Sequence, residues 1–113
     1  MQHFEGNGRL SQAIVNGDTI YFSGQTSRDG GTVAEQTKAV LNKIDVLLEK
    51  YGSDKKHILN AQIFLRDMRD FQEMNTVWDA WVEKRYEPTR ACVEARLAAD
   101  IIGVEIVIIA AKK

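Results

Sequence analysis

The spacing of hydrophobic residues along the chain switches between the alternation of strands and the wider period of helices. Residues 10–15 (LSQAIV) and 19–24 (TIYFSG) are short runs rich in strand-forming residues. The Asn16-Gly17 pair between them is a strong hairpin signal. The chain is therefore predicted to begin with a β-hairpin, followed by a loop at residues 27–31.

The next segment has the apolar spacing of an amphipathic helix. Thr32 and Glu35 stand three residues apart, which is the pattern of a capping box, and they predict a helix that runs to about Lys50. Gly52 is the natural C-terminal cap. The apolar stripe of this helix consists of Val33, Val40, Leu41, Ile44, Leu47 and Leu48.

A second helix is predicted further along the chain. Asp70 with Glu73 forms an N-terminal signal, and Pro88 ends the segment because the residue before a proline avoids helical geometry. The stripe of this helix consists of Phe71, Met74, Trp78, Trp81 and Val82.

Three more strands are predicted, over residues 57–66, 88–96 and 103–111. The first of them alternates Leu59, Ala61, Ile63 and Leu65 against Asn60, Gln62, Phe64 and Arg66. The element order ββαβαββ predicts an α+β layer, in which two helices cover one face of a mostly antiparallel sheet.

The last strand is apolar on both faces. Val104, Ile106, Ile108 and Ala110 form one face, and Glu105, Val107, Ile109 and Ala111 form the other. Such a strand is typical of a sheet that is buried on both sides. Because the two helices cover only one face, we expect another copy of the chain or another protein to cover the second, which would otherwise be a large exposed apolar patch.

Charged residues stand on these last two strands. The strand over 88–96 places Arg90, Cys92, Glu94 and Arg96 on one face. If this strand and 103–111 are hairpin neighbours, Arg90 lies near Glu105. Two interpretations stay open: a buried or interfacial salt bridge, which would stabilise the fold little, and an anion site. In the anion site Arg90 would bind a carboxylate and Glu105 would act as an acid/base.

Composition narrows the class of protein. The chain has 113 residues, and its charges balance to a net charge of −1, which gives no electrostatic reason to expect nucleic acid or an anionic membrane as partner. No apolar run is long enough to span a membrane, and the N-terminus has no signal-peptide hydrophobic region. One cysteine and two histidines form neither a disulfide framework nor a metal-ligand pattern. These features indicate a single cytoplasmic domain over residues 1–113.

The segment PTRACVEARLAADIIGVEIVIIAA (88–111) resembles the RidA/YjgF family, which is also described as endoribonuclease L-PSP-like. That family has Pro, Arg, Cys, Val and Glu, then a loop, then Glu in an apolar strand. The likeness extends upstream through YFSGQ (21–25), NAQIFLRDMRDFQEMN (60–75) and WDAW (78–81). The resemblance implies a chorismate mutase-like fold and a homotrimer with a central barrel of sheets, helices outside and three sites between subunits.

The resemblance also implies an activity: hydrolysis of reactive 2-imino or enamino acids to 2-keto acids and ammonia, without cofactor or metal. Arg90 matches the arginine that binds the substrate carboxylate, and Glu105 matches the glutamate that positions water and shuttles protons. Ser23 and Asn75 match pocket residues, and Cys92 matches a residue that lines the site. Cys92 need not be a nucleophile, because a lone strand cysteine is more often a small apolar filler.

The chain departs from the family pattern at GRLSQ (8–12), where Leu10 occupies the position of a tyrosine that reaches the neighbouring site. The pocket is expected to be more apolar at that edge. An alternative function is a non-catalytic trimer that binds a small carboxylate metabolite as a sensor or scaffold. Some relatives are described as ribonucleases or translation inhibitors, which the balanced charge of this chain does not favour.

Overall fold

The computed structural model describes residues 1–113 and confirms the predicted order of elements, with one strand added at the N-terminus. The elements are β1 (Gln2–Phe4), β2 (Ala13–Asn16), β3 (Thr19–Phe22), α1 (Val33–Lys50), β4 (Ile58–Leu65), α2 (Phe71–Trp81), β5 (Thr89–Glu94) and β6 (Val104–Ala111), with 3₁₀ turns η1 (Lys55–His57) and η2 (Met68–Asp70). Strand β1 was not predicted, because its three residues have no alternating apolar pattern.

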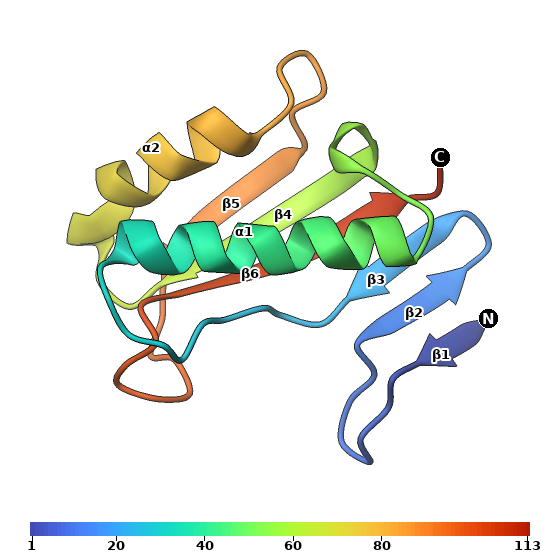
Figure 1. Ribbon diagram of the computed structural model, residues 1–113, viewed down its shortest axis with the longest axis horizontal. Coiled ribbons are helices and arrows are strands. Elements are labelled where there is room, and N and C mark those ends of the chain that lie inside the picture. The colour runs from blue at the N-terminus through green and yellow to red at the C-terminus, as the bar shows by residue number, and fades with distance from the viewer.

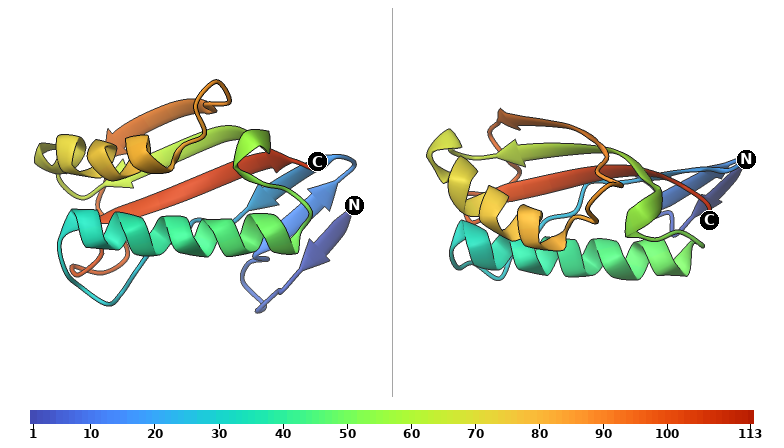
Figure 2. Two further views of the ribbon diagram at one scale, coloured as in Figure 1. Left: turned by 45° about the horizontal axis from the view of Figure 1, so that its top comes forward. Right: turned by 90° about the horizontal axis from the view of Figure 1, so that it is seen from above.

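The six strands form one sheet in the order β1-β2-β3-β6-β4-β5. All neighbours are antiparallel except β4 and β5, which are parallel because α2 carries the chain back between them. Both helices lie on the same side of the sheet (Figures 1 and 2). The predicted α+β layer, with two helices on one face of a mostly antiparallel sheet, is therefore confirmed.

The last two strands are not hairpin neighbours, so the condition under which Arg90 would lie near Glu105 in one chain is not met. Strand β4 lies between β5 and β6 and pairs with both. The loop that joins β5 to β6 crosses the end of β4, where Arg66 donates from Nε to Ile102 O (2.8 Å) and from Nη2 to Leu97 O (3.2 Å) and Ala99 O (2.6 Å). These bonds hold the β5–β6 loop at the end of β4, so the chain passes β4 before it forms β6 and does not make a tight turn from β5.

Helix α1 begins and ends as predicted. Thr32 Oγ1 accepts from Glu35 N (3.1 Å), and Glu35 Oε1 accepts from Thr32 N (3.0 Å), which completes the capping box. Gly52 follows the helix at φ +83°, a conformation that favours glycine. The predicted stripe of α1 packs on the sheet, with Leu47 only partly buried. The core of the sheet under the helices includes Ala61, Ile63, Leu65, Val104, Ile106, Ile108 and Ala110.

The alternation predicted for residues 57–66 is interrupted by a bulge between Ile58 and Asn60. Ile58 is 5% exposed and Leu59 is 48% exposed, so Leu59 does not join the buried face as the pattern predicted. A bulge adds one residue to a strand and shifts the phase of the side chains that follow.

The start of α2 is where the sequence predicted it, but Asp70 makes no side-chain capping bond. The turn η2 precedes the helix and is itself capped by Asp67, which accepts from Arg69 N (2.9 Å). Glu73 does not act at its own helix terminus. Its Oε2 accepts from Ala34 N (2.8 Å) and thereby joins α2 to the first turn of α1.

The face of the sheet opposite the helices has no second layer in the chain (Figure 2). Apolar and aromatic side chains gather there, including Tyr21, Phe64, Val93, Val107 and Ile109. Tyr21 is 45% and Val93 is 49% exposed. Neither helix on the other face is long and apolar enough to cross a membrane.

Candidate functional site

Arg90 lies on the edge strand β5 and faces the helices. It pairs in register with Ala61, a buried residue of the helix-facing side of β4. Its Nη1 donates to Asn75 Oδ1 of α2 at 2.8 Å. This bond joins Asn75, a predicted pocket residue of α2, to Arg90 on the sheet.

Two aromatic rings of α2 also contact the guanidinium. The Arg90 Cζ lies 5.9 Å from the centroid of the Phe71 ring and 5.5 Å from that of Trp78, within the range of cation–π attraction. Arg90 forms no ion pair with any acidic residue of the chain. A half-buried guanidinium without a carboxylate partner is suited to bind an anion.

Cys92 follows Arg90 on the same face of β5 and is partly buried against the core. Burial raises the pKa of the Cys92 thiol, and the nearby charge of Arg90 opposes this only in part. The thiol is therefore neutral at pH 7, which agrees with the interpretation as a lining residue that is not a nucleophile. Asn75, Arg90 and Cys92 together form what we call the arginine cluster.

Glu105 lies on β6 and makes no hydrogen bond or ion pair through its side chain. Its carboxylate lies directly against Gly24. A Cβ atom built on Gly24 would be 2.3 Å from Glu105 Oε2 and 2.9 Å from Cδ, far closer than real Cβ contacts. Gly24 therefore leaves the space that the carboxylate occupies.

Ser23 and Leu10 belong to the same end of the sheet. The Ser23 hydroxyl donates to Ser11 O (2.6 Å), which ties the end of β3 to the loop that carries Leu10. Leu10 is 44% exposed, and its amide donates to Asn7 Oδ1 (3.0 Å). Gly24 and Glu105, with Ser23 next to Gly24 in the chain, form what we call the glutamate cluster, and Leu10 is joined to it only through the loop that Ser23 binds.

The two clusters lie on opposite faces of the sheet. Glu105 pairs with Phe64 of β4, whereas Arg90 pairs with Ala61, and side chains at odd separations along a strand point to opposite sides. A salt bridge between Arg90 and Glu105 of the same chain is therefore excluded. One chain contains both clusters but does not bring them together.

Three residues that contact the predicted site residues were missed from the sequence. Phe71 and Trp78 belong to the predicted apolar stripe of α2 and pack on the core as predicted. Their separation from Asn75 by one helical turn on either side is the signal that also places them beside Arg90. Gly24 had no signal beyond its place in the segment YFSGQ, because its contact with Glu105 depends on the pairing of Gln25 with Ile106.

Comparison with known proteins identifies relatives along the whole length of the chain. The family model described as endoribonuclease L-PSP matches residues 1–112. A RutC family protein of Haemophilus influenzae is 46% identical over 112 residues, which cover 97% of each chain. The RutC family protein YoaB of Escherichia coli strain K12 is 41% identical over 107 residues, which cover 95% of this chain and 94% of YoaB.

A solved structure has the same fold. A crystal structure of a member of the YjgF protein family from Neisseria meningitidis superposes with a TM-score of 0.96 at 50% identity, and the match covers 99% of this chain and 94% of that one. Family model, relatives and structure agree over nearly every residue, and they confirm the resemblance found in the sequence. The chain therefore belongs to the RutC/YjgF family, the family of the endoribonuclease L-PSP model.

Proposed function

We propose that this protein hydrolyses reactive 2-imino and enamino acids to 2-keto acids and ammonia, in clefts between the subunits of a homotrimer. The observation that carries the proposal is that Arg90 is held in place but has no acidic partner. Its guanidinium is held by Asn75, yet it has no acidic partner in the chain. The family is linked to the deamination of reactive intermediates, which are small carboxylates of the kind that Arg90 would bind.

The separation of the two clusters supports a site between subunits. Arg90 and Glu105 lie on opposite faces of one sheet, so a ligand that contacts both would need Arg90 from one chain and Glu105 from another. The apolar face around Val107 and Ile109 would be covered in the same assembly. The trimer thus accounts both for the divided site and for the uncovered face.

In the proposed reaction Arg90 binds the substrate carboxylate through its planar fork of N–H donors. The iminium carbon is already electrophilic, so a fixed carboxylate beside one oriented water removes much of the entropic barrier. Glu105 takes a proton from the attacking water as the C–O bond forms, which gives a carbinolamine. It then returns the proton to nitrogen, and the hydroxyl proton of the carbinolamine passes to Glu105 as the C–N bond breaks and the C=O bond forms. The products are the 2-keto acid and ammonia, which takes the last proton from Glu105 and leaves as ammonium. Ser23, Cys92 and Leu10 would line the pocket, with Leu10 as an apolar edge.

A nuclease function, which the name of the family model suggests, receives less support from this chain. The net charge is −1. His57 is bound through Nδ1 to Asp54 (2.6 Å) at an exposed turn, and His3 stands on the edge strand β1, so the two histidines do not form an acid–base pair. A phosphate backbone would call for a basic surface.

The assay generates imines with an amino acid oxidase and follows their hydrolysis with and without the protein. We expect wild type to accelerate hydrolysis. Arg90→Ala should lower the rate of the catalysed reaction by about 100-fold or more, because one charge-assisted hydrogen-bonded pair with the substrate is lost. Arg69→Ala is the matched control, because Arg69 is exposed and pairs only with Asp67 two residues away. Light scattering should give three times the chain mass of 12.8 kDa for all three proteins.

Each alternative has its own outcome in this experiment. If wild type binds 2-keto acids but accelerates no imine, the protein is a carboxylate-binding sensor or scaffold. If Arg90→Ala dissociates the assembly, Arg90 has a structural role. A monomeric wild type would remove the argument for a shared cleft.

A further inference from the structure

The aromatic and amide side chains around Arg90 come from one face of one helix. Phe71, Asn75 and Trp78 follow at the spacing i, i+4, i+7, so they lie in a row along α2. The row contacts the guanidinium at 5.9 Å, 2.8 Å and 5.5 Å, respectively. We propose that these three residues, the α2 cradle, are positioning residues that hold Arg90 in its binding conformation before any ligand arrives. The inference rests on the proposed function in taking a carboxylate as the ligand.

The donors of Arg90 are largely unused. A guanidinium has five N–H donors in a rigid fork, and only Nη1 has a partner in the chain. Arg66 shows the opposite pattern, because it donates to three loop carbonyls and lies 3.9 Å from Asp100. Arg66 is a structural arginine. The ring faces of the cradle orient Arg90 without consuming its donors, so a bidentate pair remains for a carboxylate.

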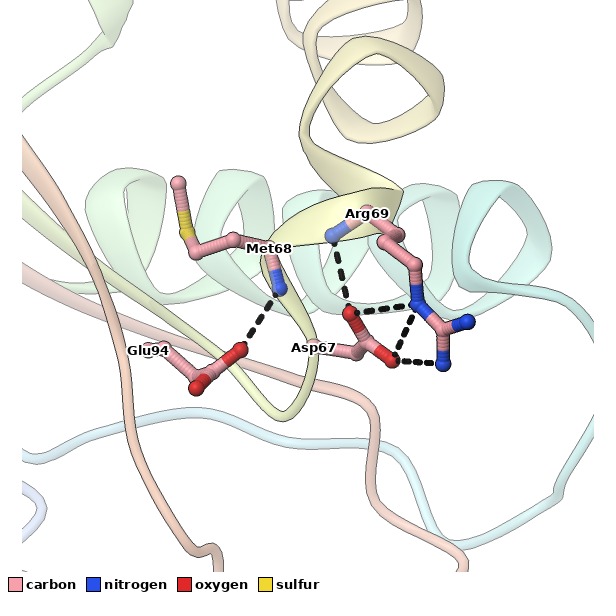
Figure 3. A network of polar contacts seen from close by, with 4 residues as sticks. All are labelled: Asp67, Met68, Arg69 and Glu94. Carbon is pink, nitrogen blue, oxygen red and sulfur yellow. Dashed lines mark hydrogen bonds and ion pairs between the residues drawn. The ribbon is translucent and has the colours of Figure 1, made fainter.

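The cradle is joined to the strand that carries Arg90 at a second point. Glu94, four residues after Arg90 on β5, accepts from Met68 N (2.9 Å) in the turn that leads into α2. Figure 3 shows this bond beside the Asp67–Arg69 pair that closes the same turn. Two hydrogen bonds, at Met68 and at Asn75, thus join the η2–α2 segment to β5 and hold Phe71, which lies between them in the chain, beside the guanidinium.

Preorganisation of this kind affects ligand affinity more than the chemical step. An arginine side chain has many rotamers, and a ligand that binds a free arginine must order it. The cradle orders the side chain in the free protein, so the ligand meets a fixed fork. Loss of a ring should therefore weaken the binding of carboxylates, raise KM and leave kcat nearly unchanged.

The test uses Phe71→Leu, which keeps an apolar side chain but removes the ring, and Phe71→Tyr, which keeps the ring. NMR titration with pyruvate, the simplest 2-keto acid, should show about 2- to 10-fold weaker binding for Phe71→Leu and wild-type binding for Phe71→Tyr. Methyl pyruvate, which has no charge, should bind all forms alike. The matched control is Tyr86→Leu, since Tyr86 carries the same kind of contact with Lys56 at 5.4 Å.

The outcomes separate this inference from the proposed function. Wild type that binds pyruvate but hydrolyses no imine would refute the proposed function and leave the cradle supported by the affinities. Phe71→Leu with wild-type affinity for pyruvate, or with equal losses for pyruvate and its ester, would overturn the cradle. Wild type that does not bind pyruvate would overturn it too, because the cradle would then have no carboxylate to serve. Thermal melts establish that all variants are folded.

Discussion

At the scale of single residues, the candidate site depends on neighbouring residues that hold a charged group in place or leave space for it. Arg90 is fixed by three side chains of α2, and Glu105 has its place because Gly24 has no side chain. The sequence predicted the two charged residues but not their supports. A charged residue in an apolar strand is visible in the sequence, whereas the close approach of β3 and β6 is a property of the folded sheet.

Gly24→Ala should impair catalysis without unfolding the protein. The added methyl group would overlap Glu105 Oε2, which is the far end of a flexible side chain, so the carboxylate can move at little cost in stability. A displacement of about 1 Å at a reacting group can cost about 100-fold in rate. We expect kcat for imine hydrolysis to fall about 10- to 100-fold, with an unchanged melting temperature and unchanged pyruvate affinity.

Gly6→Ala is the matched control for this substitution. A Cβ at Gly6 would meet nothing closer than Leu10 O at 3.8 Å, an ordinary contact. This variant should keep full activity. Wild-type kcat in Gly24→Ala, alongside an inactive Glu105→Gln, would show that Glu105 acts from a position that Gly24 does not control.

At the scale of elements, the sequence predicted where helices and strands lie better than it predicted which strands pair with each other. The capping box of α1 was predicted from Thr32 and Glu35 because its two hydrogen bonds join residues three apart. The β5–β6 loop is bound by Arg66, which lies more than thirty residues before it in the sequence. Contacts over such separations leave no local pattern in the sequence from which the neighbours of β5 could be predicted. The same distinction explains why the hairpin of β2 and β3, which a local turn signal predicted, is confirmed, whereas the sequence left the pairing of β5 and β6 open.

The two predicted N-caps should differ in their contribution to stability. Thr32 accepts a hydrogen bond at the start of α1, whereas Asp70 makes none at the start of α2. Thr32→Ala should lower the free energy of unfolding by about 1 kcal/mol. Asp70→Ala should cost less, because only the attraction between its charge and the helix dipole is lost, and that attraction is screened by salt.

Urea unfolding in 1 M NaCl, at one fixed protein concentration, measures this difference with the dipole interaction suppressed. Thr32→Ser, which keeps the hydroxyl, should be close to wild type. Equal losses for Thr32→Ala and Asp70→Ala would mean that the hydrogen bond of Thr32 contributes nothing specific.

At the scale of the whole molecule, the two-sided apolar strand was the most informative feature of the sequence. One face of β6 packs under α1 and the other remains partly exposed in the chain. The apolar pattern of β6 predicts that another chain packs on this second face. It does not predict which surface packs there, because that depends on the fit between separate chains. Under the proposed function, the positions of Arg90 and Glu105 on opposite faces would also call for a second chain, which is an independent argument for the same assembly.

Ile109→Lys should therefore dissociate the proposed trimer and abolish imine hydrolysis together. Ile109 lies in the middle of the uncovered face, paired with Tyr21 on one side and Asn60 on the other. A lysine there can reach water in an isolated chain but would bury its charge in a subunit interface.

Val46→Lys is the control, because Val46 is an apolar residue that is 65% exposed on the outside of α1. Light scattering should give a mass near 12.8 kDa for Ile109→Lys and the wild-type mass for Val46→Lys. An Ile109→Lys protein with wild-type mass and activity would place the interface elsewhere, and a dissociated but active one would show that a single chain suffices for catalysis.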